Sequence, residues 1–285
     1  MRGMNPLNRY RTWCMLPLLV GLLAGCASTT QGSSDAAQRQ QLLLVSPQQM
    51  DRMTAQAYAQ SLRQAKRQGQ LNQRLDVLAR VRRVANRLIP ATGAFRADAP
   101  GWAWEVNVID RPDLNAWAMH GGKMAVYTGL VDKLQLTDDE LAAIMGHEMA
   151  HALREHSREA MSQALATDLT INLGVQLLGL GAGVGDMVST GADLMLRLPN
   201  SRRAESEADR LGLELAARSG FDPRAAVSLW QKMAAQSQGK QPPAWLSTHP
   251  SHSQRVAELS ALAQQLLPVY RQATSRRDPV VRRAP

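Results

Sequence analysis

The chain of 285 residues is expected to adopt an α+β fold that is mainly α-helical and contains one small sheet. Three observations predict this fold. Apolar residues recur at helical spacing before residue 90, strand and turn patterns follow between residues 102 and 129, and helical patterns return from residue 137 onward. Because 45 % of the residues are hydrophobic, the chain can bury a sizeable core.

The N-terminus has the layout of a secretory signal peptide. Three arginines precede an apolar run, Met15–Ala24, that is too short to span a bilayer comfortably. The run ends in "LAGC", residues 23–26, which resembles a bacterial lipobox with cleavage before Cys26 and a lipid on its thiol. An ordinary signal peptide with an incidental cysteine is the alternative. Neither of the next two residues, Ala27 and Ser28, is an aspartate. By analogy with lipoprotein sorting, this indicates that the protein is located in the outer membrane.

The net charge and the cysteine count indicate which partners and which disulfides the protein can have. Removal of residues 1–25 deletes three arginines and no acidic residue, so the formal charge falls from +9 to +6. No compact basic motif with interleaved aromatic residues occurs, so no nucleic-acid partner is predicted. Cys14 is removed as well, and Cys26 alone cannot form an intramolecular disulfide.

Residues 26–45 are rich in Ser, Thr, Gln and Ala, and they are predicted to form a disordered tether. The domain itself is expected to occupy residues 46–272. Its first half contains two helices and three strand segments: a helix from Ser46-Pro47 to about Arg67, a helix over 71–88 that Pro90 ends, a strand over 102–110, and two strands over 115–129 joined at Gly121-Gly122. The strand at 115–119 is either an edge or an interior strand of the sheet.

The second half is predicted to be helical. Thr137 and Glu140 form a capping box at the start of its first helix. The uncharged segment 169–185 contains five glycines and suits a buried helix, a membrane-surface contact or a plug over the site. Further helices are expected in "SRRAESEADRLGLELAARSG", from Asp222 to about Gln236, and after "STHP". Residues 273–285 hold four arginines and are predicted to be a mobile basic tail.

The stretch "AAIMGHEMAHALREH", residues 142–156, contains the motif H-E-x-x-H. His147 and His151 lie about 40° apart on one helical face, where two imidazoles can bind one tetrahedral zinc ion. Glu148 is close enough to act on a metal-bound water without being a ligand. Two histidines on a solvated helix face are the alternative. His156, about 180° from His147 around the helix, is expected at the surface.

A catalytic zinc ion requires a third protein ligand and an open fourth position. Glu205 and Asp209 share one face of the helix that contains them, whereas Glu207 lies about 200° from Glu205 and points away. Glu205 can therefore bind the metal, and Asp209 can accept a hydrogen bond from a ligand histidine and fix its tautomer. A solvated helix face is the alternative for these acids.

Four ordered motifs carry a resemblance to a known family: "NAWAMHGGKMAVYTGL", "HEMAH", "SRRAESEAD" and "STHP". Together they resemble the zinc metallopeptidase family of the CaaX prenyl protease and the heat-shock membrane protease HtpX, over roughly residues 46–268. The resemblance implies a zincin-type (gluzincin) domain with one zinc ion per chain. It also implies His147, His151 and Glu205 as metal ligands, Glu148 as catalytic base and Asp209 as supporting acid.

His249 matches a histidine that lies near the metal in that family. Pro250 holds it in an extended conformation just before a helix. The first hypothesis is that His249 stabilises the oxyanion. The alternatives are that it closes the fourth coordination position in a resting, self-inhibited state, or that it is a structural loop residue. His120 and His252 are expected at the surface or rim of the site.

The expected function follows from these motifs and from the N-terminus. No uninterrupted apolar run of about 20 residues occurs, unlike in the membrane-embedded branch of the family. The resemblance therefore points to the small outer-membrane lipoprotein peptidases. We expect a zinc endopeptidase that is anchored to the periplasmic face of the outer membrane and degrades misfolded or misassembled envelope proteins. Alternatives are a chaperone-like assembly factor that cuts rarely and a zinc-stabilised structural lipoprotein.

Overall fold

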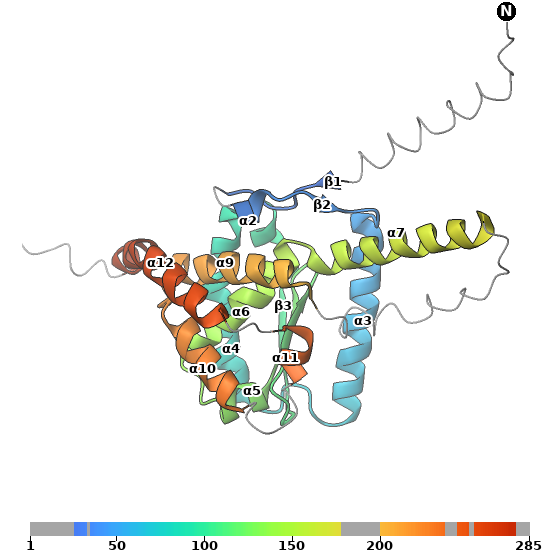
Figure 1. Ribbon diagram of the computed structural model, residues 1–285. Coiled ribbons are helices and arrows are strands. Elements are labelled where there is room, and N and C mark those ends of the chain that lie inside the picture. Colours follow the sequence, from blue (N-terminus) through green and yellow to red (C-terminus); the bar gives the residue numbers. More distant parts are fainter. Residues whose placement is uncertain (1–25, 33–34, 178–199, 237–243, 251–253, 278–285) are drawn as a thin grey trace, which may run out of the picture.

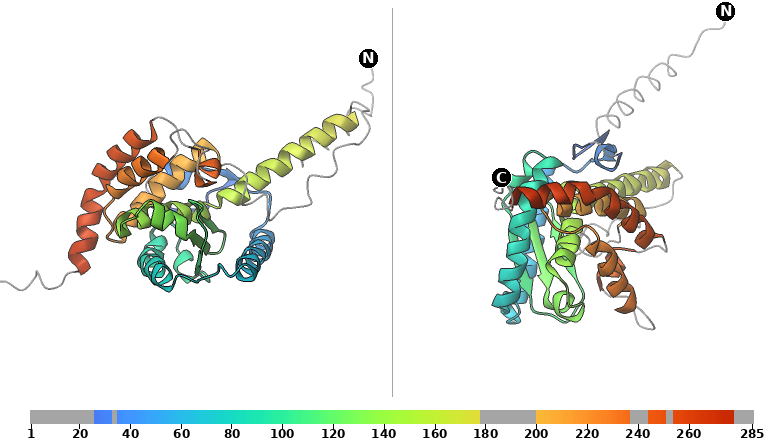
Figure 2. Two further views of the ribbon diagram at one scale, coloured as in Figure 1. Left: turned by 90° about the horizontal axis from the view of Figure 1, so that it is seen from below. Right: turned by 90° about the vertical axis from the view of Figure 1, so that its left-hand side faces the viewer.

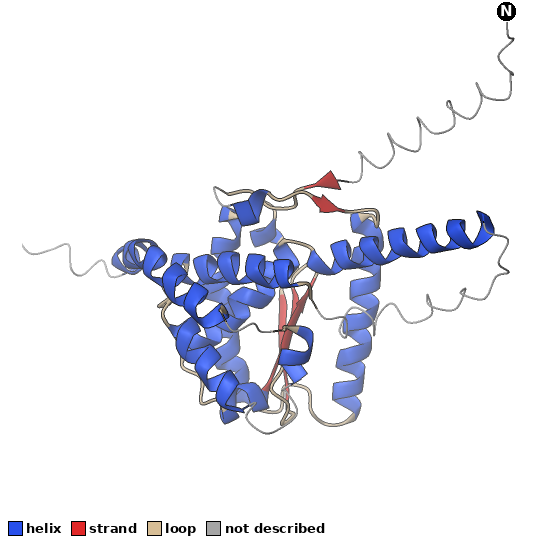
Figure 3. Ribbon diagram, viewed as in Figure 1, coloured by secondary structure: helices blue, strands red, loops and turns tan. Residues whose placement is uncertain are grey.

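The computed structural model describes residues 26–32, 35–177, 200–236, 244–250 and 254–277. The signal peptide expected at residues 1–25 and residues 178–185 of the glycine-rich segment lie outside these ranges, whereas residues 169–177 are helical. Within them, helices surround one small mixed sheet, which confirms the α+β, mainly helical fold class (Figures 1 and 3).

From residue 47 onward, helices, a small sheet and again helices follow one another in the expected order. The strands are β1 (Cys26–Ala27), β2 (Gln41–Leu42), β3 (Glu105–Ile109), β4 (Ala116–Met119) and β5 (Lys123–Tyr127). The helices are α2 (Asp35–Gln38), α3 (Pro47–Arg67), α4 (Leu75–Leu88), α5 (Thr128–Lys133), α6 (Asp138–Leu153), α7 (His156–Leu177), α9 (Arg202–Arg218), α10 (Ala225–Gln236), α11 (Ala244–Thr248) and α12 (Arg255–Arg277). Two 3₁₀ helices, η1 (Ile89–Ala94) and η2 (Ala99–Gly101), join α4 to β3.

The main sheet has the order β3-β5-β4, with β3 parallel and β4 antiparallel to β5. Gly121 and Gly122 have φ angles of 75° and 84°, so the turn between β4 and β5 uses two left-handed residues, as the sequence predicts. In the described part of the chain β4 pairs only with β5, so it is an edge strand. Helix α3 packs on one face of the sheet, and α4 and α6 pack on the other.

Helix α6 runs through the middle of the molecule, between β4 and α9 (Figures 1 and 2). Thr137 and Glu140 make the predicted capping box at its start. Helices α6 and α9 cross closely at Gly146 and Gly212. A Cβ on Gly212 would lie 2.6 Å from the backbone nitrogen of His147. The absence of side chains at this crossing brings the acids of α9 close to the histidines of α6.

The N-terminal segment, residues 26–45, differs from the disordered tether that its composition predicts. Its described residues form β1, α2 and β2 and pack onto the domain. The hydroxyl groups of Ser28 and Thr30 both donate to the carbonyl oxygen of Ala37, and Gln41 is only 1 % exposed. The prediction was wrong for these residues because the polar side chains find partners within the fold instead of water.

Two helix boundaries also differ from the expectation. Helix α4 begins at Leu75 instead of residue 71, because Leu71 forms an isolated bridge with Ile109 and Asn72 adopts a left-handed φ of 56°. Helix α12 continues to Arg277, so the first residues of the expected tail are helical, and residues 278–285 lie outside the described ranges. Among the described helices, none has both the length and the hydropathy that crossing a membrane requires.

Candidate metal centre

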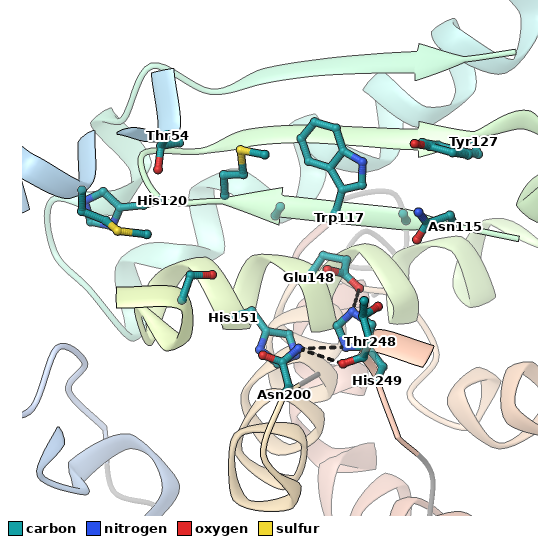
Figure 4. A pocket seen from close by; sticks show the side chains of 15 residues that line it. Thr54, Asn115, Trp117, His120, Tyr127, Glu148, His151, Asn200, Thr248 and His249 are labelled. Carbon is teal, nitrogen blue, oxygen red and sulfur yellow. Dashed lines mark hydrogen bonds and ion pairs between the residues drawn. The ribbon is translucent and has the colours of Figure 1, made fainter. Parts of the chain in front are cut away.

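Four side chains from three parts of the chain converge in one buried group. Figure 4 shows two of them, His151 and His249, below strand β4. His147 and His151 come from α6, Glu205 comes from α9, and His249 follows α11. Their ligand atoms all lie within 4.8 Å of one another. All four residues are buried, and Glu205 is only 1 % exposed. The structure therefore brings together the three ligands expected from the sequence and adds a fourth donor.

The spacing of these atoms fits a zinc ion. The Nε2 atoms of His147 and His151 lie 3.0 Å apart. Glu205 carboxylate oxygens lie 3.5 Å from His147 Nε2 and 3.3 Å from His151 Nε2. A tetrahedral zinc ion with bonds of about 2.0–2.1 Å would hold its ligand atoms roughly 3.3 Å apart. Two imidazoles and one carboxylate are also a donor set that catalytic zinc sites use.

The charges of the buried groups favour a cation at the same place. Burial lowers the pKa of His147, but hydrogen bonds to Asp209 and Glu205 outweigh it and raise this pKa to about 9. Burial lowers the pKa of His151 well below its ordinary value. Burial alone would raise the pKa of Glu205, but hydrogen bonds to the three histidines hold it far below 4.5. An ionised carboxylate thus faces several imidazoles, and a metal cation would complete its pairing.

Asp209 supports His147 from behind, as its helical position predicts. Its Oδ1 atom lies 3.0 Å from His147 Nδ1, so it can accept the ring N–H and leave Nε2 free for a metal. The sequence analysis missed Arg255, which is 1 % exposed and donates to both acids, at 2.9 Å from Glu205 and 2.7 Å from Asp209. This arginine fixes the two acids of α9 relative to each other.

Glu148 lies beside the ligand cluster and is 2 % exposed. Its Oε1 atom accepts a hydrogen bond of 2.6 Å from the indole Nε1–H of Trp245, which the sequence analysis also missed. The same oxygen lies 3.4 Å from His249 Nε2. Glu148 is thus held in one orientation next to the four candidate ligands without belonging to that group.

His249 is stacked on Trp245, with ring centroids 4.6 Å apart and planes inclined by 20°. Its Nδ1 atom lies 2.9 Å from Glu205 Oε1 and 3.3 Å from His147 Nε2. Asn200 approaches the same atom at 3.4 Å. The Nδ1 atom of His249 therefore occupies the place of a fourth metal donor, and its Nε2 atom faces Glu148.

The expectation that His156 lies at the surface was wrong, because this residue is 3 % exposed. Helix α6 ends at Leu153, and Glu155 adopts a left-handed φ of 51° before α7 begins at His156. Extrapolation at 100° per residue fails across this break. The His156 ring instead turns back toward the centre, and its Nδ1 atom lies 2.8 Å from His151 Nδ1. Glu207 points away from the candidate metal ligands, as expected, and contacts His156.

A cleft of about 110 Å³ lies between β4 and the ligand cluster. The cleft is lined by strand β4, by Met50 and Thr54 of α3, and by Glu148. Figure 4 labels Thr54 and Glu148 in its wall. His120 lines the far end of the cleft, with Nε2 3.1 Å from Asp51, so it belongs to the cleft wall although it is 8 % exposed. His252 lies outside the described residues. Glu148 therefore shares this cleft with strand β4.

Comparison with known proteins shows which proteins this chain is similar to. The sequence model of peptidase family M48 matches residues 77–263, a range that contains all four donors and Glu148. "Metalloendopeptidase OMA1, mitochondrial" of Bos taurus is 37 % identical over 186 residues, which are 60 % of this chain and 35 % of the relative. "Mitochondrial metalloendopeptidase OMA1" of Arabidopsis thaliana is 36 % identical over 180 residues, 62 % of this chain and 36 % of the relative.

A bacterial relative covers a similar part of the chain. "Beta-barrel assembly-enhancing protease" of Escherichia coli K12 is 31 % identical over 175 residues, which are 59 % of this chain and 36 % of the relative. The chain thus spans about a third of the length of these three curated relatives.

Proposed function

The chain belongs to peptidase family M48, and from this premise we propose that it is an endopeptidase that uses one zinc ion to cleave unfolded or misassembled envelope proteins. Members of the family are zinc metallopeptidases, so the class of enzyme and the cofactor expected from the sequence are confirmed at the level of the family. One observation carries the proposal for this chain. The donor atoms of His147, His151 and Glu205 lie 3.0–3.5 Å apart, with Glu148 beside them in a cleft below an edge strand.

The residues of the site divide the chemistry among them. A bound zinc ion would supply Lewis acidity, which acidifies water and polarises a carbonyl group. Glu148 takes a proton from the attacking water and delivers it to the leaving amine. The hydrogen bond from Trp245 keeps one oxygen of Glu148 fixed, so the other oxygen is available for the proton. Asp209 holds the tautomer of His147 that directs Nε2 to the metal.

The edge strand supports the choice of substrate. Strand β4 has one pairing partner in the described structure, so an extended peptide could add to its free side. This mode of binding recognises the backbone of the substrate more than its side chains. A folded protein offers few extended segments for it, whereas an unfolded or misassembled protein offers many. The cleft therefore suits clients that have lost or not yet reached their structure.

A comparison with the Glu148→Gln variant tests the activity. Cleavage of an unfolded protein such as reduced casein should fall by about 10²–10⁴ in kcat/KM, the usual contribution of a general base. Zinc content should remain near one ion per chain, because Glu148 is outside the ligand group. A variant that keeps zinc and cleaves at the wild-type rate would overturn the proposal.

We propose further that His249 closes the site as a fourth donor in the resting state. The position of its Nδ1 atom, near both Glu205 and His147, supports this role over oxyanion stabilisation. His249→Ala should then raise basal cleavage of an unfolded protein with zinc content unchanged. A role in oxyanion stabilisation predicts the opposite sign, with kcat and kcat/KM both lowered by about 10²–10³.

A second candidate function is that of a chaperone-like assembly factor that holds clients and cuts rarely. The same position of His249 favours it, because a closed site would keep turnover low. A strain that lacks the protein separates the two functions when it is complemented with Glu148→Gln. Full complementation would support the assembly factor, and failure to complement would support the peptidase.

We also propose the periplasmic face of the outer membrane as the location. Support comes from residues 23–26 and from the sequence before them. A lipid on Cys26 would anchor the N-terminal segment to the membrane. Cys26→Ser should release the protein from outer-membrane fractions and leave cleavage of casein intact, and retention of the variant in those fractions would argue against the anchor.

A further inference from the structure

A second group of buried polar side chains lies behind the ligand His151, on the side away from Asp209. His156 is its first member, with Nδ1 2.8 Å from His151 Nδ1 and Nε2 3.2 Å from Glu207 Oε2. His156 and Glu207 are 3 % and 5 % exposed. A chain of hydrogen bonds thus connects a metal ligand with a carboxylate that does not touch the metal site.

The direction of these hydrogen bonds is fixed by the metal site. His151 presents Nε2 to the ligand cluster, so its ring proton must be on Nδ1 when it binds a metal as a neutral imidazole. This N–H donates to Nδ1 of His156. The proton of His156 is then on Nε2 and donates to the carboxylate of Glu207. Each ring therefore has one tautomer that satisfies both of its neighbours.

Two arginines hold Glu207 in place. Arg154 lies next to the end of α6 and contacts Glu207 Oε2 at 3.0 Å. Arg39 belongs to the N-terminal segment and donates to both carboxylate oxygens of Glu207. Arg39 also makes two hydrogen bonds to Glu159, of 2.6 and 2.7 Å. The N-terminal segment is therefore connected to His151 by hydrogen bonds that run through Arg39, Glu207 and His156.

We propose that Arg39, Glu207 and His156 are positioning residues for the zinc ligand His151, so that the docked N-terminal segment forms part of the support of the zinc site. A metal-bound histidine requires a partner for its other ring nitrogen, and such partners fix its orientation and raise its basicity. Asp209 is that partner for His147, and His156 is that partner for His151. The inference rests on the proposed function only for the identity of the metal.

The zinc affinity of the full chain tests whether His156 supports His151. Zinc dissociation constants are measured by competition with a chelator, without substrate, for wild type, His156→Leu and His156→Gln. Leucine fills the space but accepts no hydrogen bond, and we expect the dissociation constant to rise about 10- to 100-fold. Glutamine has one acceptor and one donor to replace both contacts of the imidazole, so it should restore most of the affinity.

A variant in the N-terminal segment tests whether Arg39 contributes to this support. Arg39→Ala changes a side chain that is 20 % exposed, so the domain should still fold. The dissociation constant of zinc should rise less than in His156→Leu, up to about 10-fold, because Arg154 still contacts Glu207. Arg80→Ala is the matched control. Arg80 is 27 % exposed and pairs with Asp138 at 2.6 Å, at the far end of α6 from His151, so its loss should leave zinc affinity unchanged.

Three results would overturn the proposal. One is wild-type zinc affinity in both His156→Leu and Arg39→Ala. The second is equal loss of affinity in Arg39→Ala and Arg80→Ala, and the third is equal loss in His156→Leu and His156→Gln, because general destabilisation would then explain the loss. Wild-type protein that binds zinc but cleaves no unfolded protein would contradict the proposed function alone, since these measurements involve no substrate.

Discussion

The two histidines of α6 receive their support from different regions of the molecule. His147 is supported by Asp209, which Arg255 of helix α12 holds. His151 is supported by His156 and Glu207, which Arg39 of the N-terminal segment helps to hold. Helix α9 serves both, since Asp209 lies on one of its faces and Glu207 on another. A single helix thus connects the zinc site with both ends of the described chain.

The two supports differ in how firmly they are built into the domain. The side chain of Arg255 is 1 % exposed and lies 3.8 Å above the ring of Trp230, within the packed helices α9, α10 and α12. The side chain of Arg39 is 20 % exposed and comes from a segment of short elements. The support of His147 therefore belongs to the core, whereas the support of His151 depends on docking of the N-terminal segment.

Substitution of an acidic residue on α9 by alanine should have the largest effect on zinc binding. Glu205→Ala removes a ligand, so zinc content should fall from one ion per chain to none at micromolar protein. Glu207→Ala removes only support, so zinc should still bind, about 10- to 100-fold more weakly. Metal analysis after dialysis, with activity measured at saturating zinc, distinguishes the two. Loss of zinc from Glu207→Ala alone would mean that the wrong face of α9 had been assigned to the metal.

The next largest effect is expected at Arg255. Arg255→Leu leaves the buried carboxylate of Glu205 and the partly buried carboxylate of Asp209 without their shared cation. Removal of one partner from a buried ion pair typically costs about 3–5 kcal/mol, and we expect a loss of this size in the free energy of unfolding of the zinc-free protein. Denaturation in urea with a chelator present measures it.

Arg39→Ala is the comparison for Arg255→Leu. Its loss of stability should be smaller, because the Arg39 side chain is partly solvated and Arg154 remains beside Glu207. Equal losses in the two variants would contradict the distinction between a core support and a docked support.

The sequence predicted those parts of the site that regular helix geometry determines. His147 and His151 are four residues apart on α6, and Glu205 and Asp209 are four apart on α9, so their shared faces follow from 100° per residue. Glu207 was correctly placed on another face of α9. Capping of α6 and the turn at Gly121-Gly122 also depend on adjacent residues and were predicted.

The remaining parts depend on contacts that no local pattern reports. His156 was misplaced because a left-handed residue, Glu155, interrupts the helix before it. Trp245 contacts Glu148 across 97 residues of sequence, and Arg39 contacts Glu207 across 168. In the N-terminal segment, composition predicted solvation because it does not show which polar side chains have partners inside the protein.

The smallest expected effect is the response to acid of the support that the docked N-terminal segment, through Arg39, gives to His151. Burial raises the pKa of Glu159, but hydrogen bonds from Arg39 and Gln41 outweigh it and hold this pKa below its ordinary value of 4.5. Above pH 4.5 the carboxylate is ionised in both the docked and the undocked state, and its stabilisation is fully present. Below pH 4.5 that stabilisation is lost as pH falls through the lower, folded-state pKa.

Hydrogen exchange of the zinc-free protein can detect this loss, because metal release then plays no part. Amides of residues 26–45 should lose protection below pH 4.5 sooner than amides of α6, once rates are corrected for the intrinsic effect of pH. Glu159→Gln should show weak protection of residues 26–45 at neutral pH already, because its amide cannot pair with Arg39 as a carboxylate does. Parallel loss of protection in both regions would place the N-terminal segment within the same cooperative unit as the core.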